Sequence, residues 1–178
     1  ENIEYEIIDD KLILKIRSFK RKYLDQAKSK FNELEEKLKN IDIKNVILDI
    51  RGNQDGTDEY FKYLSMFANR NIVENNKWQD LILSKNYEIE EILIPKGTEK
   101  KYNMYLLVDG NVFSAADTLA RVCKNTGFAK VVGETTLGGG CGLTISNIKI
   151  KRVKEKVEKI KGYTEYEIEL GDSYLYFS

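Results

Sequence analysis

The sequence predicts a domain of the α/β class. Short apolar runs typical of buried strands alternate along the chain with longer segments whose apolar residues recur at helical spacing. The length of 178 residues suits one domain, and hydrophobic residues make up 42% of the chain, which is enough to build a core. We therefore expect a single domain over residues 1–178.

The first half of the chain has the order strand, helix, strand, helix. Residues 11–18 alternate apolar and charged side chains, as a strand with one buried face does. Residues 20–40 carry an apolar stripe at helical spacing, and residues 45–50 form a short apolar run that suits a buried strand. A second helical stripe begins at Asp58.

The second half continues the alternation after an irregular stretch. We expect a hairpin from about residue 78 to residue 94, ended by the turn at Pro95. The next expected elements, in chain order, are a buried strand at 104–108, a helix at 114–125 that stops at Gly127, a strand at 130–133 and a glycine-rich loop at 137–142. The remaining residues, 144–178, show β-type alternation with a charged excursion at 151–161.

Composition argues against several functions. Basic and acidic residues both number 29, so the chain has no excess positive charge, and we expect no nucleic-acid partner. No run of about 18 apolar residues is present, which predicts no membrane span in this segment. The chain contains no histidine, and this excludes a histidine-ligated zinc site or a Ser-His dyad formed within it. We expect no metal and no cofactor.

The two cysteines, Cys123 and Cys141, are weak evidence for a disulfide. Cys123 falls in the apolar face of the helix predicted at 114–125, so we expect it to be a small core residue.

Ser114 lies where a predicted strand turns sharply into a predicted helix. The hydroxyl of a serine at such a turn projects outward, and the positive end of the helix stabilises an oxyanion that develops there. The backbone N–H of Ala115 is then a natural oxyanion donor. Taken locally, Ser114 has a second interpretation, in which it simply caps the helix.

Two further segments bear on Ser114. Residues 49–56, with the sequence Asp-Ile-Arg-Gly-Asn-Gln-Asp-Gly, form a turn-rich loop at the carboxyl end of a strand, where α/β sheets place their sites. Residues 131–140 end in Gly138, Gly139 and Gly140, which allow a peptide backbone to approach closely. Each segment taken alone is more often an ordinary loop.

Together, and in this order, the three segments resemble the C-terminal processing (tail-specific) serine peptidases, a family that includes the tricorn core and the retinoid-binding repeat proteins. The family pattern is Asp-Leu-Arg-x-Asn-x-Gly-Gly, then a Ser-Ala-x-Glu-like turn, then Gly-Glu-x-Thr followed by glycines. The corresponding residues here are 49–56, 114–117 and 133–136, and the resemblance covers roughly residues 5–142.

The resemblance implies a β-β-α superhelix of the crotonase and Clp-protease type, and a serine-type peptidase acting on polypeptides. It implies Ser114 as nucleophile, the amides of Ala115 and Gly56 as the oxyanion hole, and Gly138 and Gly139 in the substrate-binding loop. It also favours a location outside the cytoplasm.

The chain departs from the family pattern at two positions. The Ser-Lys branch carries a lysine about 25 residues after the nucleophile, and the matching residue here is Gly139. Asp55 stands where the pattern has a glycine. We therefore expect the tricorn-type arrangement, in which a histidine from before the first strand is the base. Since this chain opens on Glu1 within a strand-like pattern, we interpret it as a catalytic-core segment of a longer protein, truncated at both ends and inactive alone.

The strongest alternative is a noncatalytic peptide-binding or scaffold protein that retains the peptidase fold. An acyl-CoA enzyme of the crotonase type on the same architecture is a further alternative. An α/β-hydrolase esterase requires Gly-x-Ser-x-Gly, whereas Val112 and Ala116 stand at the two glycine positions around Ser114. Ser146 and Lys149 match Ser-x-x-Lys, but the alternation around them predicts a strand rather than the helix that this motif requires.

Overall fold

The computed structural model describes residues 1–80, 85–140, 148–151, 167–170 and 175–176. The chain divides into two compact units. The first comprises residues 1–76 and 90–141, and the second comprises residues 77–89 and 142–178. All the residues that the sequence places in a site belong to the first unit.

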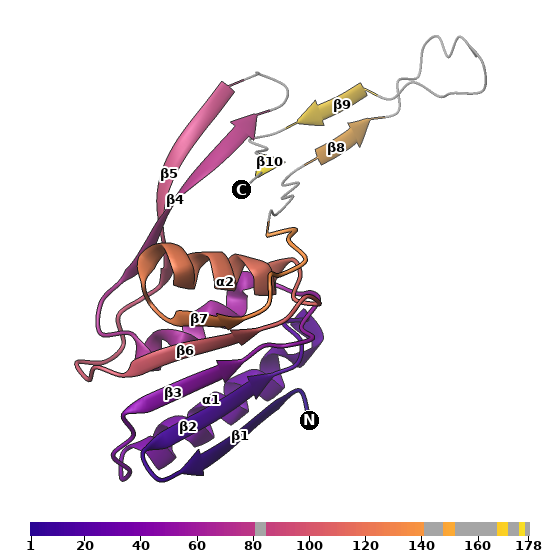
Figure 1. Ribbon diagram of the computed structural model, residues 1–178. Coiled ribbons are helices and arrows are strands. Elements are labelled where there is room, and N and C mark those ends of the chain that lie inside the picture. The colour runs from indigo at the N-terminus through magenta and orange to yellow at the C-terminus, as the bar shows by residue number, and fades with distance from the viewer. Residues whose placement is uncertain (81–84, 141–147, 152–166, 171–174, 177–178) are drawn as a thin grey trace. The chain divides into compact units, whose positions relative to one another are not determined.

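The first unit is built on a five-stranded sheet with the strand order β1-β2-β3-β6-β7 (Figure 1). β1 (Ile3–Ile8) pairs antiparallel with β2 (Lys11–Ile16). The remaining neighbours, β3 (Asn45–Asp49), β6 (Asn103–Val108) and β7 (Lys130–Gly133), pair in parallel. This mixed sheet confirms the α/β class and the strands predicted near residues 11, 45, 104 and 130.

The alternation seen in the sequence sets which face of the sheet is buried. Leu12, Leu14 and Ile16 of β2 are at most 1% exposed, whereas the residues between them are half-buried. Side chains point to opposite faces at successive strand positions, so one whole face packs inward. β3 and β6 repeat this alternation and give the same face to the core.

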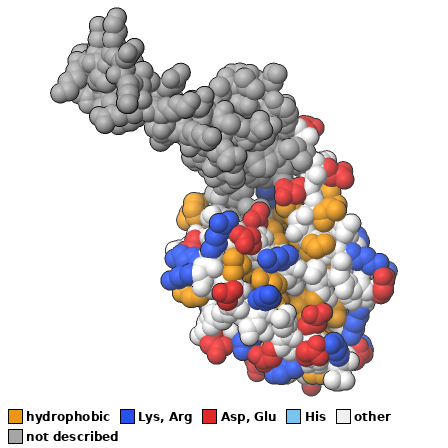
Figure 2. Space-filling view, turned by 180° about the vertical axis from the view of Figure 1, so that it is seen from behind, with side chains coloured by type: hydrophobic (Ala, Val, Ile, Leu, Met, Phe, Trp, Pro, Cys, Tyr) orange, Lys and Arg blue, Asp and Glu red, His pale blue; other side chains and the backbone are white. Residues whose placement is uncertain are grey.

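One layer of helices covers that face. It contains η1 (Arg21–Tyr23), α1 (Leu24–Leu38), η2 (Asp58–Phe67) and α2 (Ala115–Thr126). η2 packs against both α1 and α2, which places the three in a single layer. Acidic and basic side chains are interspersed over the face of the molecule that Figure 2 shows.

The helical segment after Asp58 differs from a regular α-helix. Residues 58–67 form a 3₁₀ helix, in which Phe61, Leu64 and Phe67 are buried. A 3₁₀ helix has three residues per turn, so side chains spaced by three line up along one edge. The Thr57 side chain accepts a hydrogen bond from the Glu59 amide and caps the start of this segment.

The ends of α2 follow the sequence closely. The helix stops at Gly127, whose φ of 69° is the left-handed conformation that glycine favours after a helix. Cys123 is fully buried on the core side of α2, which confirms its predicted role, and burial raises the pKa of its thiol to about 12. Cys141 lies outside the described residues.

The remaining strands form two small sheets. β4 (Ile72–Asp80) lies between β5 (Lys85–Ile94) and β10 (Leu175–Tyr176) in one sheet, so the predicted hairpin region does contain two neighbouring strands, the first starting earlier than expected. β8 (Ile148–Lys151) pairs antiparallel with β9 (Glu167–Leu170) in the other. Lys149 is therefore in a strand, as predicted, while Ser146 is outside the described residues.

Candidate active site

Four segments leave the carboxyl ends of parallel strands at one edge of the five-stranded sheet. They follow β2, β3, β6 and β7, and comprise residues 17–20, 50–57, 109–114 and 134–140. Because parallel strands all end at the same edge, segments far apart in the sequence meet there. Every motif that the sequence analysis selected lies at this edge.

Ser114 has a strained backbone at the start of α2. Its φ of 59° and ψ of −129° are rare for a residue other than glycine. Such a conformation costs about 1–3 kcal/mol and persists only where the surroundings impose it. The Ser114 side chain makes no capping hydrogen bond to the helix, so the interpretation that this serine merely caps α2 is wrong. The hydroxyl is left available for other chemistry.

The Ala115 amide lies directly beside this serine. Ala115 is the first residue of α2, and the first N–H groups of a helix lack an intrahelical partner. Within the described part of the chain, no hydrogen bond reaches this amide, whereas the Ser114 amide is taken up by the Gly138 carbonyl at 3.1 Å. The positive end of the helix dipole also lies at this point. An anion bound here would accept a hydrogen bond from the Ala115 amide and would be stabilised by the helix dipole.

Backbone contacts from two loops hold the turn before Ser114. The Phe113 amide donates to the Asn53 carbonyl at 3.1 Å, and the Leu137 amide donates to the Val112 carbonyl at 2.9 Å. Phe113 also forms a parallel bridge with Gly138. The loop after β3 and the glycine-rich loop after β7 therefore both hold the Ser114 turn through backbone contacts.

Two carboxylates organise the loop after β3. The buried Asp49 side chain forms a two-point ion pair with Arg51, each contact being 2.8 Å, and this bonding lowers the pKa of Asp49. Asp109, at the end of β6, accepts the Gly52 amide at 3.0 Å and the Asn111 amide at 3.1 Å. These amide donors, that of Gly52 first, lower the pKa of Asp109. Both groups are thus kept ionised. Asp49 orders the β3 loop from within, and Asp109 ties that loop to the turn after β6.

Asn53 is fully buried at the centre of the β3 loop. Its side-chain nitrogen donates a hydrogen bond to the Ile16 carbonyl at 3.2 Å, and its backbone carbonyl accepts one from the Phe113 amide. A buried amide is tolerated only when its polar atoms are paired, as they are here. Asn53 therefore links the end of β2 to the residue before Ser114, a role that its place in the motif did not disclose.

The backbone of Gly56 runs alongside the backbone of Phe19 at very short range. The two residues form a parallel bridge in which the Phe19 amide donates to Asp55 and the Thr57 amide donates to Phe19. In such a ladder the Gly56 amide points away from Phe19. A Cβ atom on Gly56 would lie 2.0 Å from the Phe19 carbonyl carbon, and the φ of Gly56 is 121°. Packing alone therefore demands glycine here, and the oxyanion role of its amide stays a prediction.

A side chain at position 56 is expected to destabilise the first unit. Gly56→Val must displace the Phe19 backbone and hold a valine at positive φ, so we expect a loss of about 3 kcal/mol or more. Gly52→Ala is the matched control, because Gly52 also has positive φ, 74°, but nothing lies within 4 Å of its Cβ position. The control should lose about 1 kcal/mol. Urea denaturation of both variants measures the difference, and equal losses would contradict this packing account.

The glycine-rich loop lies against the Ser114 turn. Gly138 has a φ of 91°, no described atom lies within 4 Å of its Cβ position, and its carbonyl accepts a hydrogen bond from the Ser114 amide. Gly139 has a φ of 75°, and a Cβ there would lie 2.1 Å from the Phe113 ring. The position that carries a lysine in the Ser-Lys branch is therefore closed to any side chain while Phe113 keeps its place.

Asp117 fastens this loop to α2. It lies in the first turn of the helix, where a carboxylate complements the helix dipole. Its two oxygens accept the Thr136 hydroxyl at 2.6 Å and the Gly140 amide at 3.0 Å. Thr118 adds a hydrogen bond from its hydroxyl to the Gly140 carbonyl. The sequence placed Asp117 three residues after Ser114, but only the structure assigns it this contact.

The described part of the chain supplies no evident base for Ser114. Lys130 is paired with Tyr105 at the start of β7, while the site lies beyond Gly133 at the other end. The three intervening steps span about 10 Å of strand. The described residues also contain no cluster of three or more acidic, cysteine or histidine side chains that could hold a metal ion, and no helix among them is long and apolar enough to cross a membrane.

Comparison with known proteins identifies the family. The family model for peptidase family S41 matches residues 11–164, so this chain belongs to peptidase family S41. No curated protein sequence matches the chain.

Solved structures with the same fold include a lipoprotein from Streptococcus agalactiae, with 17% identity and a TM-score of 0.59 over 98% of this chain and 58% of that one. The photosystem II D1 C-terminal processing protease has 15% identity and a TM-score of 0.57 over 81% of this chain and 39% of that one. Mature CPAF has 14% identity and a TM-score of 0.59 over 98% of this chain and 44% of that one.

These matches confirm the predicted resemblance and the Clp-protease-like α/β fold. The chain spans only 39–58% of the length of the three structures.

Proposed function

We propose that this chain carries the nucleophile and the oxyanion site of a serine peptidase that hydrolyses polypeptides, with Ser114 as the nucleophile. The supporting observation is the strained Ser114 at the start of α2, with its hydroxyl making no capping bond to the helix. The Ala115 amide beside it donates to no partner among the described residues. A strained serine between a strand and a helix is the arrangement that exposes a nucleophile in other hydrolases.

In the proposed reaction, the Ser114 oxygen attacks the carbonyl carbon of the scissile peptide bond while a base removes the hydroxyl proton. The carbonyl oxygen becomes an oxyanion, which the Ala115 amide and the helix dipole stabilise. We assign Gly56 as the second donor, because its amide points away from Phe19 and is unpaired among the described residues. The base then returns its proton to the leaving amine, and water releases the acyl group by the same route.

We assign substrate contact to Gly138 and Gly139. Both have positive φ values, and no described atom lies within 4 Å of the Gly138 Cβ position, beside the Ser114 turn. A polypeptide backbone can approach glycines closely because no Cβ stands in the way. The proposed substrate is therefore an extended polypeptide. We place the reaction outside the cytoplasm, and the support for this is that a lipoprotein shares the fold.

We propose that the base comes from residues outside this chain. The chain has no histidine, and the Phe113 ring occupies the space that a lysine at position 139 would need. The same two observations support a second candidate function, a peptide-binding scaffold that keeps the fold without turnover.

A fluorophosphonate probe separates these two functions. Such a probe bonds covalently to an activated serine hydroxyl and leaves an ordinary surface serine unmodified. In the full-length protein we expect one adduct, located at Ser114 by mass spectrometry. An adduct at another serine would contradict the assignment of Ser114, and a protein that takes up no probe and cleaves no peptide would favour the scaffold.

A further inference from the structure

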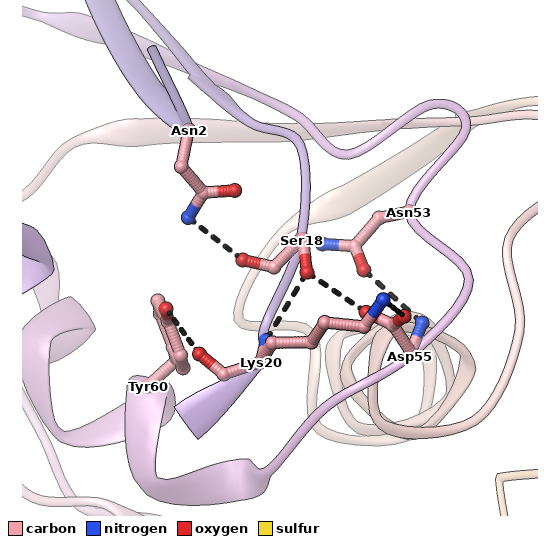
Figure 3. Close-up of polar contacts among 6 residues, drawn as sticks. All are labelled: Asn2, Ser18, Lys20, Asn53, Asp55 and Tyr60. Carbon is pink, nitrogen blue, oxygen red and sulfur yellow. Dashed lines mark hydrogen bonds and ion pairs between the residues drawn. The ribbon is translucent and has the colours of Figure 1, made fainter. Parts of the chain in front are cut away.

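Asp55 replaces the glycine of the family pattern, and its side chain makes contacts that a glycine cannot make. The carboxylate lies between Ser18 and Lys20, in the segment that follows β2 (Figure 3). We propose that Asp55 is a positioning residue, which clamps the loop at 52–56 to the segment at 18–20 and so keeps the Ser114 turn in its strained form. The consequence for catalysis rests on the proposed function, but the clamp itself does not.

The segment at 18–20 is a rigid anchor. The Phe19 ring is 1% exposed and packs against the Tyr60 ring, with the centroids 5.0 Å apart. The Asn2 side chain donates to the Ser18 carbonyl at 2.9 Å, and the Tyr60 hydroxyl donates to the Lys20 carbonyl at 3.1 Å (Figure 3). Burial raises the pKa of Tyr60 to about 12, so this donor keeps its proton at ordinary pH. The segment is thus fixed to the core on both sides of Phe19.

Asp55 attaches to this anchor through both oxygens of its carboxylate. One oxygen accepts the Ser18 hydroxyl at 2.8 Å, and the other is 2.8 Å from the Lys20 ammonium nitrogen. The Ser18 hydroxyl oxygen in turn accepts a hydrogen bond from the Lys20 amide at 3.2 Å, which closes a small network. The Asp55 carbonyl also accepts the Phe19 amide. A glycine at position 55 would keep that backbone bond but lose the carboxylate contacts, and it would gain backbone freedom.

The clamp is connected to the nucleophile through Asn53. The Asn53 side-chain oxygen lies 3.5 Å from the Asp55 amide, and the Asn53 carbonyl receives the Phe113 amide, one residue before Ser114. A shift of the loop must therefore move the partner that holds Phe113. Because a strained backbone persists only while its surroundings enforce it, loosening the loop lets the Ser114 turn relax.

The Lys20–Asp55 ion pair of the clamp is exposed to solvent, so added salt weakens it. The side chains of Lys20 and Asp55 are 51% and 36% exposed, and both line a hollow of about 530 Å³ together with Arg17, Gly52 and Gln54. Salt screens an exposed ion pair but leaves the hydrogen bond from Ser18 in place. The two halves of the clamp can therefore be separated by experiment.

The test compares Asp55→Ala and Asp55→Asn in the full-length protein with the matched control Asp42→Ala. The Asp42–Lys100 pair, at 2.9 Å, also joins distant parts of the chain, but it lies at the opposite edge of the sheet, before β3 and β6. We expect Asp55→Ala to lower kcat by about 10- to 100-fold, the cost of a small displacement at a reacting group, with KM nearly unchanged. Asp55→Asn should lose less, because an amide oxygen still accepts the Ser18 hydroxyl. The control should match the unaltered protein.

Amide hydrogen exchange tests the clamp without reference to activity. In Asp55→Ala the amides of Thr57 and Phe113 should exchange at least about tenfold faster, since both donate hydrogen bonds that depend on the loop. If Asp55→Ala fails to fold, the milder Lys20→Met and Ser18→Ala variants answer the same question.

Unchanged exchange at Phe113 overturns the clamp, and unchanged kcat in an active enzyme overturns its role in positioning Ser114. An inert unaltered protein refutes the proposed function instead, and the exchange rates then still decide whether the clamp exists.

Discussion

Ser114→Ala in the full-length protein is expected to reduce peptide turnover by on the order of 10⁶-fold, because nucleophile and base act as a unit and the loss of one removes the benefit of both. The fold should survive, since the Ser114 hydroxyl makes no capping bond to α2. The measurement is kcat on an unfolded polypeptide substrate, with Ser29→Ala on the exposed surface of α1 as the matched control.

Ser114→Gly distinguishes chemistry from folding. Glycine adopts a φ of 59° without the steric cost that serine and alanine bear there. We therefore expect Ser114→Gly to be as inactive as Ser114→Ala, yet at least as stable in urea and by as much as about 1–2 kcal/mol more so. Turnover by Ser114→Ala above about 1% of the unaltered rate would show that another group is the nucleophile.

The 178-residue chain by itself is expected to fold but to hydrolyse neither casein nor unfolded peptides above background. A serine hydroxyl is a weak nucleophile at neutral pH and requires a neighbouring base, and this chain contains no histidine. Lys20 is held by Asp55, whose hydrogen bond raises the pKa of Lys20 above its ordinary value. Lys124 follows Ser114 by ten residues along α2, about 15 Å of helical rise.

A longer protein that includes residues before Glu1 should be active, and replacing the histidine that we expect there should abolish its turnover. Circular dichroism of the chain alone provides the control for folding. Turnover by the chain alone that Ser114→Ala abolishes would overturn this expectation and identify a lysine base. Inertness of the longer protein as well would favour the scaffold.

The sequence by itself determined the α/β class, the main strands and the position of Ser114. The alternation in residues 11–16 and the stripe that ends at Gly127 are local patterns, set by the periods of strand and helix and by the turn chemistry of glycine. The three motifs were visible because each follows a strand that is recognisable from its own residues. The 3₁₀ form of residues 58–67 was not predicted, because apolar spacings of three and four look alike over so few turns.

Only the tertiary structure decided what fixes Ser114 in place. The strained backbone of Ser114 is held by contacts between residues that are far apart in the sequence. The hydrogen bond from Phe113 to Asn53 and the contacts of Asp55 with Ser18 and Lys20 join residues 35 to 60 positions apart. No local pattern encodes such contacts. They arise because β2, β3, β6 and β7 run parallel, so that their carboxyl ends, and the loops that follow them, are brought to one edge of the sheet.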